Sequence, residues 1–306
     1  IDADESGEDV VDAVRARRYS INDDEWGDAF TVNADPDTRE FDPQVGVDDA
    51  GQFTIVWQAA NAELEPLGIM ARRFAADGTP ESDAFMVSSG SRPVEHPALD
   101  VRGDGDLVVA WNTPDAEEPA GDVWARRFAA DGSPLDVEPV AISDTPTLGP
   151  ADVALYADGG FMVVWPSETD GTVEVLGRRF DADGAPMGEE FVIGGSADNA
   201  PKPRVAIAED GITVVTWTDN AQGGIVGQRY NGEGVPIGDR FVANDSTAGI
   251  QDASSVSAGP MGTFIVGWLD AGQLGERVMV ERFRADNATV GIKDQGEQTP
   301  MSGHLL

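Results

Sequence analysis

The chain has 306 residues, with 56 Asp or Glu against 20 Lys or Arg and a formal net charge of −36. Such an acidic surface repels nucleic acid and anionic membranes, so neither is expected as a partner. Hydrophobic residues make up 41% of the chain, which excludes a disordered acidic tail, and no apolar run approaches the ~18 residues of a membrane-spanning helix.

The acidity has two explanations that do not exclude each other. A halophilic protein tolerates self-repulsion because the Debye length falls to about 3 Å near 1 M salt. Calcium-binding loops of a secreted protein would instead neutralise part of the charge. The absence of cysteine excludes disulfide bonds and thiolate metal sites, so stability depends on packing.

The N-terminal region has the pattern of half a repeat. After an acidic extension over 1–10, Arg18-Tyr19 and a strand near Phe30-Thr31-Val32 match the second half of the units that follow, without the first half. We assign 11–42 to an N-terminal half-blade.

Two signals then recur along the chain about every fifty residues. An apolar strand ends in tryptophan at Trp57, Trp111, Trp165, Trp217 and Trp268. Arg precedes Phe or Tyr at Arg18, Arg73, Arg127, Arg179, Arg229 and Arg282. A fixed period of this length indicates one structural unit copied along the chain.

The copy that begins at Pro150 shows the order of strands within the unit. Strands are expected at 153–156, 161–165, 173–180 and near 191–193. Asp158-Gly159-Gly160 and the Asp-Gly pair at Asp183 supply tight turns, because Asp and Gly tolerate positive φ. The segment 166–171 reads as a variable polar loop.

Four antiparallel strands in about fifty residues form a β-propeller blade, so we expect an all-β propeller, with a β-solenoid or stacked sandwich as alternatives. The predicted repeat domain spans 11–293, with blades over 43–96, 97–149, 150–200, 201–251 and 252–293, and a C-terminal tail follows over 294–306. Each Trp would wedge neighbouring blades together. Each repeated Arg would stack on a ring or pair with a turn carboxylate, while a ligand channel lined by Arg and Trp is the less favoured alternative.

The two ends of the repeat array are incomplete. Asp286-Asn287 replaces Asp-Gly in the last copy, and the half-blade lacks a first and a second strand. The N-terminal strands could complete the last blade and close the ring within one chain. Alternatively, they could pair with another copy and build a fibre.

Acidic turns are the candidates for a metal site, because calcium takes about six to eight oxygen ligands. The best matches are Asp181 and Asp183, with Glu189 downstream, and the pair Asp104 and Asp106. Each segment supplies only two close carboxylates. Ordinary hairpin turns therefore explain both without metal; calcium is kept as the alternative, and no other cofactor is expected.

Catalytic motifs are scarce. The only histidines are His96 and His304, and His96 precedes Pro97 where a solvated loop role is expected. A glycosidase needs two carboxylates, and the sequence cannot select a pair among so many acids. A carboxylate pair with raised pKa values in one funnel would favour an enzyme.

The motifs Pro-x-Val, Asp-Gly-Gly-Phe-x-Val-Val-Trp and Arg-Arg-Phe-Asp-Ala-Asp-Gly, clearest over 150–193, resemble the tandem repeats of large secreted bacterial and archaeal surface proteins. The resemblance covers roughly 10–293 and implies an extracellular location and an adhesive, matrix or scaffold role.

We therefore expect a non-enzymatic, extracellular structural or adhesive protein that could form a homopolymer through its half-blade. A glycan or cell-surface molecule is the expected ligand, without nucleic acid or membrane insertion. The alternative is a glycan-binding or glycan-hydrolysing propeller whose site lies in the mouth of the central channel, where loops at 61–66 and 115–121 could converge.

Overall fold

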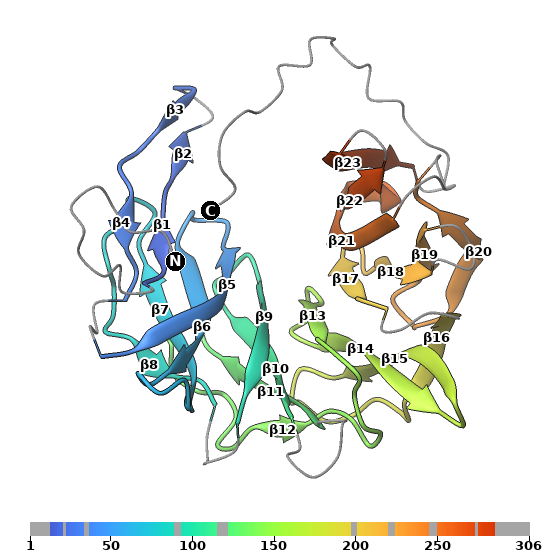
Figure 1. Ribbon diagram of the computed structural model, residues 1–306, viewed down its shortest axis with the longest axis horizontal. Coiled ribbons are helices and arrows are strands. Elements are labelled where there is room, and N and C mark those ends of the chain that lie inside the picture. The colour runs from blue at the N-terminus through green and yellow to red at the C-terminus, as the bar shows by residue number, and fades with distance from the viewer. Residues whose placement is uncertain are drawn as a thin grey trace.

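The computed structural model is an all-β propeller of five blades arranged along an arc, which confirms the predicted fold class (Figure 1). It describes residues 13–20, 23–33, 37–88, 93–114, 122–196, 201–219, 224–244, 250–272 and 275–284. The half-blade and the fifth blade lie at the two ends of the arc (Figure 1). Among these residues, no strand pairing joins one end to the other.

Each of the first four blades is a four-stranded antiparallel sheet whose strands neighbour one another in chain order. The first blade contains β5 (Arg39–Val47), β6 (Phe53–Ala60), β7 (Pro66–Phe74) and β8 (Phe85–Met86). The second contains β9 (Glu95–Val101), β10 (Leu107–Thr113), β11 (Asp122–Phe128) and β12 (Val140–Ala141). The third contains β13 (Asp152–Leu155), β14 (Phe161–Thr169), β15 (Thr172–Phe180) and β16 (Phe191–Ser196). The fourth contains β17 (Arg204–Ile207), β18 (Thr213–Asp219), β19 (Gly224–Tyr230) and β20 (Pro236–Val242).

The fifth blade has three strands in the described part of the chain: β21 (Ile250–Ala258), β22 (Phe264–Gly272) and β23 (Gly275–Phe283). Between β21 and β22 lies the short 3-10 turn η1 (Pro260–Gly262). No helix within the described ranges is long and apolar enough to cross a membrane.

The N-terminal half-blade supplies the third and fourth strands of a further blade. It contains β1 (Arg15–Ala16), β2 (Tyr19–Ser20), β3 (Glu25–Trp26) and β4 (Phe30–Thr31). In the β1–β4 pair, Arg15 lies opposite Thr31. The same register places Met70 opposite Met86 between β7 and β8. The predicted half-blade is therefore confirmed, with β1 equivalent to a third strand and β4 to a fourth.

The predicted strands of the third blade match closely, but the loop predicted over 166–171 does not form. The β14–β15 ladder continues through Pro166, opposite Val175, and ends with Thr169 opposite Thr172. A turn at Asp170-Gly171 connects the strands, and both of its residues have positive φ. Glu168, Thr169 and Asp170 are exposed at the tip of this hairpin, so their composition resembled a loop, whereas Ser167 is buried and donates to the carbonyl oxygen of Pro146 at 2.8 Å.

The tryptophans of the second strands pack between blades. Trp165 is fully buried and belongs to a hydrophobic cluster with second-blade residues that include Val108, Val123 and Ile142. Trp217 lies in the corresponding cluster between the third and fourth blades. Burial of a side chain this large favours a fixed position of one blade against the next.

Paired arginines on the third strands connect the second and the third blades to both of their neighbours. The guanidinium of Arg126 lies 5.4 Å from the centre of the Phe128 ring and donates to the carbonyl oxygen of Val87 in the preceding blade at 3.2 Å. The next residue, Arg127, donates to the carbonyl oxygen of Ala182 in the turn of the following blade. Arg18 and Arg179 reach the next blade's turn in the same way.

Candidate functional site

The first strands of the blades line the inner side of the arc (Figure 1). Each forms one edge of its sheet, and the first strands of consecutive blades contact one another. They all begin at the same end of the molecule, which we call the first-strand mouth. Seven polar residues define it: Asp42, Glu95, His96, Asp152, Lys202, Arg204 and Asp252.

Three of the first strands carry a bulge close to the mouth. The register shifts between Phe41 and Gln44 in β5, and equivalent shifts occur in β9 and β21. Asp42 and His96 have φ angles of 47° and 53° at these bulges, where a non-glycine residue is strained. Bulges re-aim side chains and strained residues gather at functional sites, so both features direct attention to this mouth.

His96 and Asp42 form a hydrogen-bonded pair across the first two blades. The Nδ1 atom of His96 lies 3.0 Å from Oδ2 of Asp42, and both side chains are about half exposed. Sequence reasoning expected His96 on a solvated loop and did not select Asp42. The signal that could have found them is the shared position of Asp42-Pro43 and His96-Pro97 in successive repeats. His304 lies outside the described residues.

Asp152 is the most perturbed carboxyl group of the mouth. Its Oδ2 accepts a hydrogen bond from the backbone N–H of Val205 at 2.8 Å, and its Oδ1 lies 3.9 Å from Arg204. Burial raises the pKa of Asp152 to about 6, with a further contribution from the charge of Asp100, although Arg204 opposes the shift. The side chain is still 17% exposed. Asp152 therefore keeps its proton up to about pH 6 and can still be reached from the channel.

Asp100 makes the same contact one blade earlier. Its Oδ2 accepts a hydrogen bond from the backbone N–H of Leu155 at 2.7 Å, and burial raises its pKa as well. Both carboxyls satisfy N–H groups on the unpaired inner edge of a first strand, which is a structural role. The two carboxyl groups with raised pKa values lie toward opposite ends of the first strands, since Asp100 lines the hollow beside Arg102 and Asp152 lies at the mouth, so they are not a pair in one funnel.

The pKa of Asp252 is displaced in the opposite direction, below its usual value. Burial alone would raise its pKa, but the hydrogen bond from Lys202 and the nearby ammonium charge lower it below the usual value. The Nζ atom of Lys202 lies 2.6 Å from Oδ2 of Asp252. Lys202 and Arg204 are two residues apart in the chain. The same segment therefore contacts both the ionised carboxylate of Asp252 and the carboxyl group of Asp152, which keeps its proton. Carboxyl groups with diverging pKa values are suited to act as base and acid.

The predicted metal ligands lie in hairpin turns. Oδ1 of Asp181 accepts hydrogen bonds from the backbone N–H of Asp183 and of Ala185, while Glu189 is exposed. Asp104 and Asp106 both bind Arg102, at 2.6 and 2.8 Å. The described residues contain no group of three or more side chains suited to hold a metal. Calcium binding at these turns stays a prediction.

A second hollow lies at the opposite end of the first strands. It encloses about 440 Å³, and its lining includes Asp49, Asp100, Arg102, Tyr156 and Glu209. Its arginine is held by the two carboxylates of its own turn, Asp104 and Asp106. Two of its carboxyl groups also have pKa values displaced in opposite directions: burial raises the pKa of Asp100, and the hydrogen bond from Arg102 lowers the pKa of Asp104. What distinguishes the first-strand mouth is the set of bulges in β5, β9 and β21.

The remaining predicted positions lie in the blades. Trp57, Trp111 and Trp268 are buried. Arg73 forms an ion pair with Glu81 at 3.5 Å, Arg229 is buried, and Arg282 is exposed on β23. Of the two loops predicted to converge at the mouth, the first forms the turn that joins β6 to β7, and 115–121 lies outside the described residues.

No protein-family model matches the chain, and no curated protein does. Solved structures do resemble it. An α-L-arabinanase from Penicillium chrysogenum, complexed with arabinobiose, has a TM-score of 0.58 at 13% identity and covers 92% of this chain and 88% of its own. An α-L-arabinofuranosidase from Fusarium graminearum has a TM-score of 0.53 at 13% identity, covering 85% and 82%. A Hadza microbial sialidase has a TM-score of 0.56 at 14% identity and covers 79% of this chain, which spans only 56% of the sialidase. Identities this low show a shared propeller fold.

These comparisons correct the expectation of a non-enzymatic structural or adhesive protein. The similar propellers are enzymes that act on glycans, so the alternative of a glycan-processing propeller is better supported. Neither the comparisons nor the described strand pairings support a homopolymer built through the half-blade.

Proposed function

We propose that the chain is a glycan-processing enzyme that binds a glycan at the first-strand mouth and hydrolyses a glycosidic bond there. The proposal rests on the contrasting contacts of two carboxyl groups at this bulged mouth: Asp152 is held against the backbone N–H of Val205 at 2.8 Å, and Asp252 binds Nζ of Lys202 at 2.6 Å. Burial, together with these contacts, displaces the two pKa values in opposite directions. The glycan-acting enzymes that share the fold support the class of substrate.

Glycoside hydrolysis commonly needs a carboxylic acid that protonates the leaving oxygen and a second carboxylate that activates water or attacks the sugar. Asp152 is suited to the first role, because it keeps its proton up to about pH 6. Once it has donated the proton, Arg204 and the N–H of Val205 stabilise the anion that remains. Asp252, held as an anion by Lys202, is suited to the second role.

The Asp42–His96 pair lies on the first two blades, at the same end of the channel. Its exposed polar atoms are suited to bind sugar hydroxyl groups and to orient a glycan toward Asp152. The pair acts as a positioning element in this proposal, because neither residue contacts the Asp152–Asp252 group in a described interaction.

The proposed location is outside the cell. The repeats resemble those of secreted bacterial and archaeal surface proteins, and polymeric glycans are found outside cells. A cysteine-free, strongly acidic chain is compatible with export.

The test is release of reducing sugar from a panel of polysaccharides and aryl glycosides that includes arabinan. Removal of a general acid should lower the rate by about 10²–10⁴-fold, so Asp152→Asn and Asp252→Asn should each lose most activity. Glu233→Gln changes an exposed carboxylate in a turn of the fourth blade and should behave as wild type. Absence of hydrolysis on every substrate at any salt concentration, or full activity in both variants at the mouth, would overturn the proposal.

A further inference from the structure

The half-blade leaves a gap where a second strand would lie. Its interface with the first blade repeats the interface between the first and second blades: Val14, Val32, Ile55 and Trp57 correspond to Ile69, Val87, Val109 and Trp111. The latter cluster also contains Val56 from a second strand, and Leu99 and Val101 pack against it. The half-blade has no described residue equivalent to Val56.

The first strand of the first blade is exposed as a result. Val45 and Val47 of β5 are 61% and 57% exposed. The residues equivalent to Val45 in the third and fourth blades, Val153 and Val205, are only 3% and 6% exposed. In those blades, second-strand side chains of the preceding blade cover the first strand.

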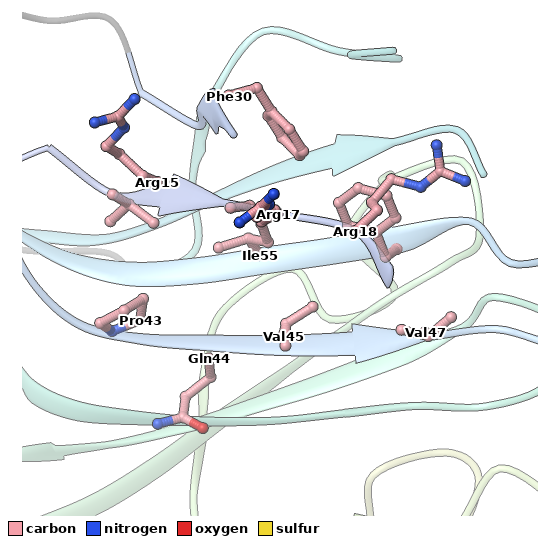
Figure 2. Close-up of a pocket in the computed structure, with 12 residues that line it drawn as sticks. Arg15, Arg17, Arg18, Phe30, Pro43, Gln44, Val45, Val47 and Ile55 are labelled. Atoms are coloured by element: carbon pink, nitrogen blue, oxygen red, sulfur yellow. The ribbon is translucent and has the colours of Figure 1, made fainter. Parts of the chain in front are cut away.

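An apolar groove of about 350 Å³ occupies the vacant place (Figure 2). Its walls are β1 on one side and Val45 and Val47 on the other, with Phe53 and Ile55 also lining it. In a complete blade the third strand pairs on both edges, whereas β1 pairs only with β4 among the described strands. The groove therefore offers apolar contacts next to a free strand edge, as in recognition by strand addition.

We propose that the groove binds the C-terminal segment of this chain, residues 285–306, as a strand added antiparallel to β1. Covering side chains in complete blades come from apolar residues two positions apart, such as Val108 and Ala110. Thr289-Val290-Gly291-Ile292 offers the same spacing, with Val290 and Ile292 on one face of an extended strand.

The position of the segment in the fold supports this occupant. It follows Arg284 at the end of β23, and the fifth blade faces the half-blade across the opening of the arc (Figure 1). The last repeat lacks the aromatic residue of a regular fourth strand, so the sequence does not commit this segment to β23. Binding at β1 would close the ring within one chain.

Hydrogen exchange of the full chain tests the proposal. The double variant Val290→Asp/Ile292→Asp should accelerate exchange in peptides that contain β1 and Val45–Val47 by about tenfold or more, because strand bonds and apolar cover are lost. The control Met301→Asp changes the same segment outside the apolar pair and should leave this exchange unchanged. Peptides from β14 and β15 should stay protected in both variants, which shows that the propeller is folded.

Disulfide formation gives a second readout, since the chain has no cysteine of its own. Val45→Cys/Ile292→Cys should form a disulfide within one chain on mild oxidation, and Val45→Cys/Met301→Cys should not. Unchanged exchange in the double variant overturns the proposal. So do disulfides between chains, or protection that increases with protein concentration together with a dimer mass, because a second copy would then fill the groove.

Discussion

At the scale of single residues, Asp152 connects the architecture with the proposed chemistry. On the inner edges of β13 and β17, a carboxylate from the preceding blade accepts a hydrogen bond from a backbone N–H group that is not used in the sheet. The same position removes the carboxyl group from water, which disfavours its charged form. A structural contact of the propeller thus produces a group able to donate a proton near pH 6.

The raised pKa of Asp152 predicts a pH-dependent stability. The native group keeps its proton until about pH 6 while the unfolded one loses it near 3.8, so its contribution is complete below about pH 4 and is lost as the pH rises through 6. The loss is on the order of 3 kcal/mol. Asp152→Asn is neutral throughout, so its stability relative to wild type should increase by that amount between pH 4 and 7 in urea unfolding. A constant difference would show that burial does not displace this pKa.

The strained conformation of His96 predicts how substitutions there will behave. Asn tolerates positive φ, so His96→Asn should keep the stability of wild type while weakening the contact with Asp42. A β-branched residue does not tolerate it, and His96→Val should lower the free energy of unfolding by about 1–3 kcal/mol. Thermal unfolding of the two variants separates strain from contact. Equal stability of both would mean that position 96 is unstrained.

At the scale of elements, the contacts between blades could be predicted in kind but not in detail. Trp and the Arg-aromatic pairs were expected to hold the blades together. The second arginine of each pair, such as Arg18 or Arg179, donates to a backbone carbonyl oxygen in the turn of the next blade. A backbone carbonyl can accept this hydrogen bond whatever side chain the turn residue carries, so the turn sequence does not reveal the contact.

The wedge position of the tryptophans predicts a large difference between buried and exposed sites. Trp165→Ala should lower the free energy of unfolding by about 3–5 kcal/mol, since it leaves a cavity between the second and third blades. Trp26 is 59% exposed on β3, so Trp26→Ala should change it by less than about 0.5 kcal/mol. A small effect at Trp165 would contradict the packing of these blades.

Strand order, turn chemistry and the half-blade could be predicted because they repeat, and repetition averages out local ambiguity. The Gly residues of the predicted Asp-Gly turns, such as Gly78 and Gly184, do adopt positive φ. Apart from Asp42 and His96, whose shared position before a proline gives a signal, the mouth could not be predicted, because Lys202 and Asp252 each occur in one blade only. Their proximity depends on how the first strands lie around the channel, which no spacing in the sequence reports.

At the scale of the whole molecule, the charge of −36 should make stability depend on salt. Raising NaCl from about 0.1 to about 2 M shortens the Debye length and should raise the Tm measured by scanning calorimetry. Calcium at equal ionic strength should do no more than magnesium if screening is the cause. A selective effect of calcium, abolished by Asp183→Asn, would instead identify the turn at Asp181 as a metal site.

The same charge predicts preference among glycans. In the mouth, Arg204 and Lys202 each lie beside a carboxylate, so an anionic sugar meets net negative charge. Neutral polysaccharides should therefore bind at least about tenfold more tightly than sialylated or uronic acid polymers at low salt, and the difference should shrink as salt increases. Isothermal calorimetry on matched oligosaccharides measures this, and tighter binding of the anionic series would contradict it.

The central claim is that a glycan binds where the first strands begin. A crystal structure of Asp152→Asn soaked with an oligosaccharide substrate tests it most directly, because the variant should bind the sugar without cleaving it. We expect a sugar ring beside residue 152, between Arg204 and Asp252, with the rest of the glycan extending toward the Asp42–His96 pair. A glycan bound instead in the opposite hollow beside Arg102, or on the outer surface of the blades, would contradict it.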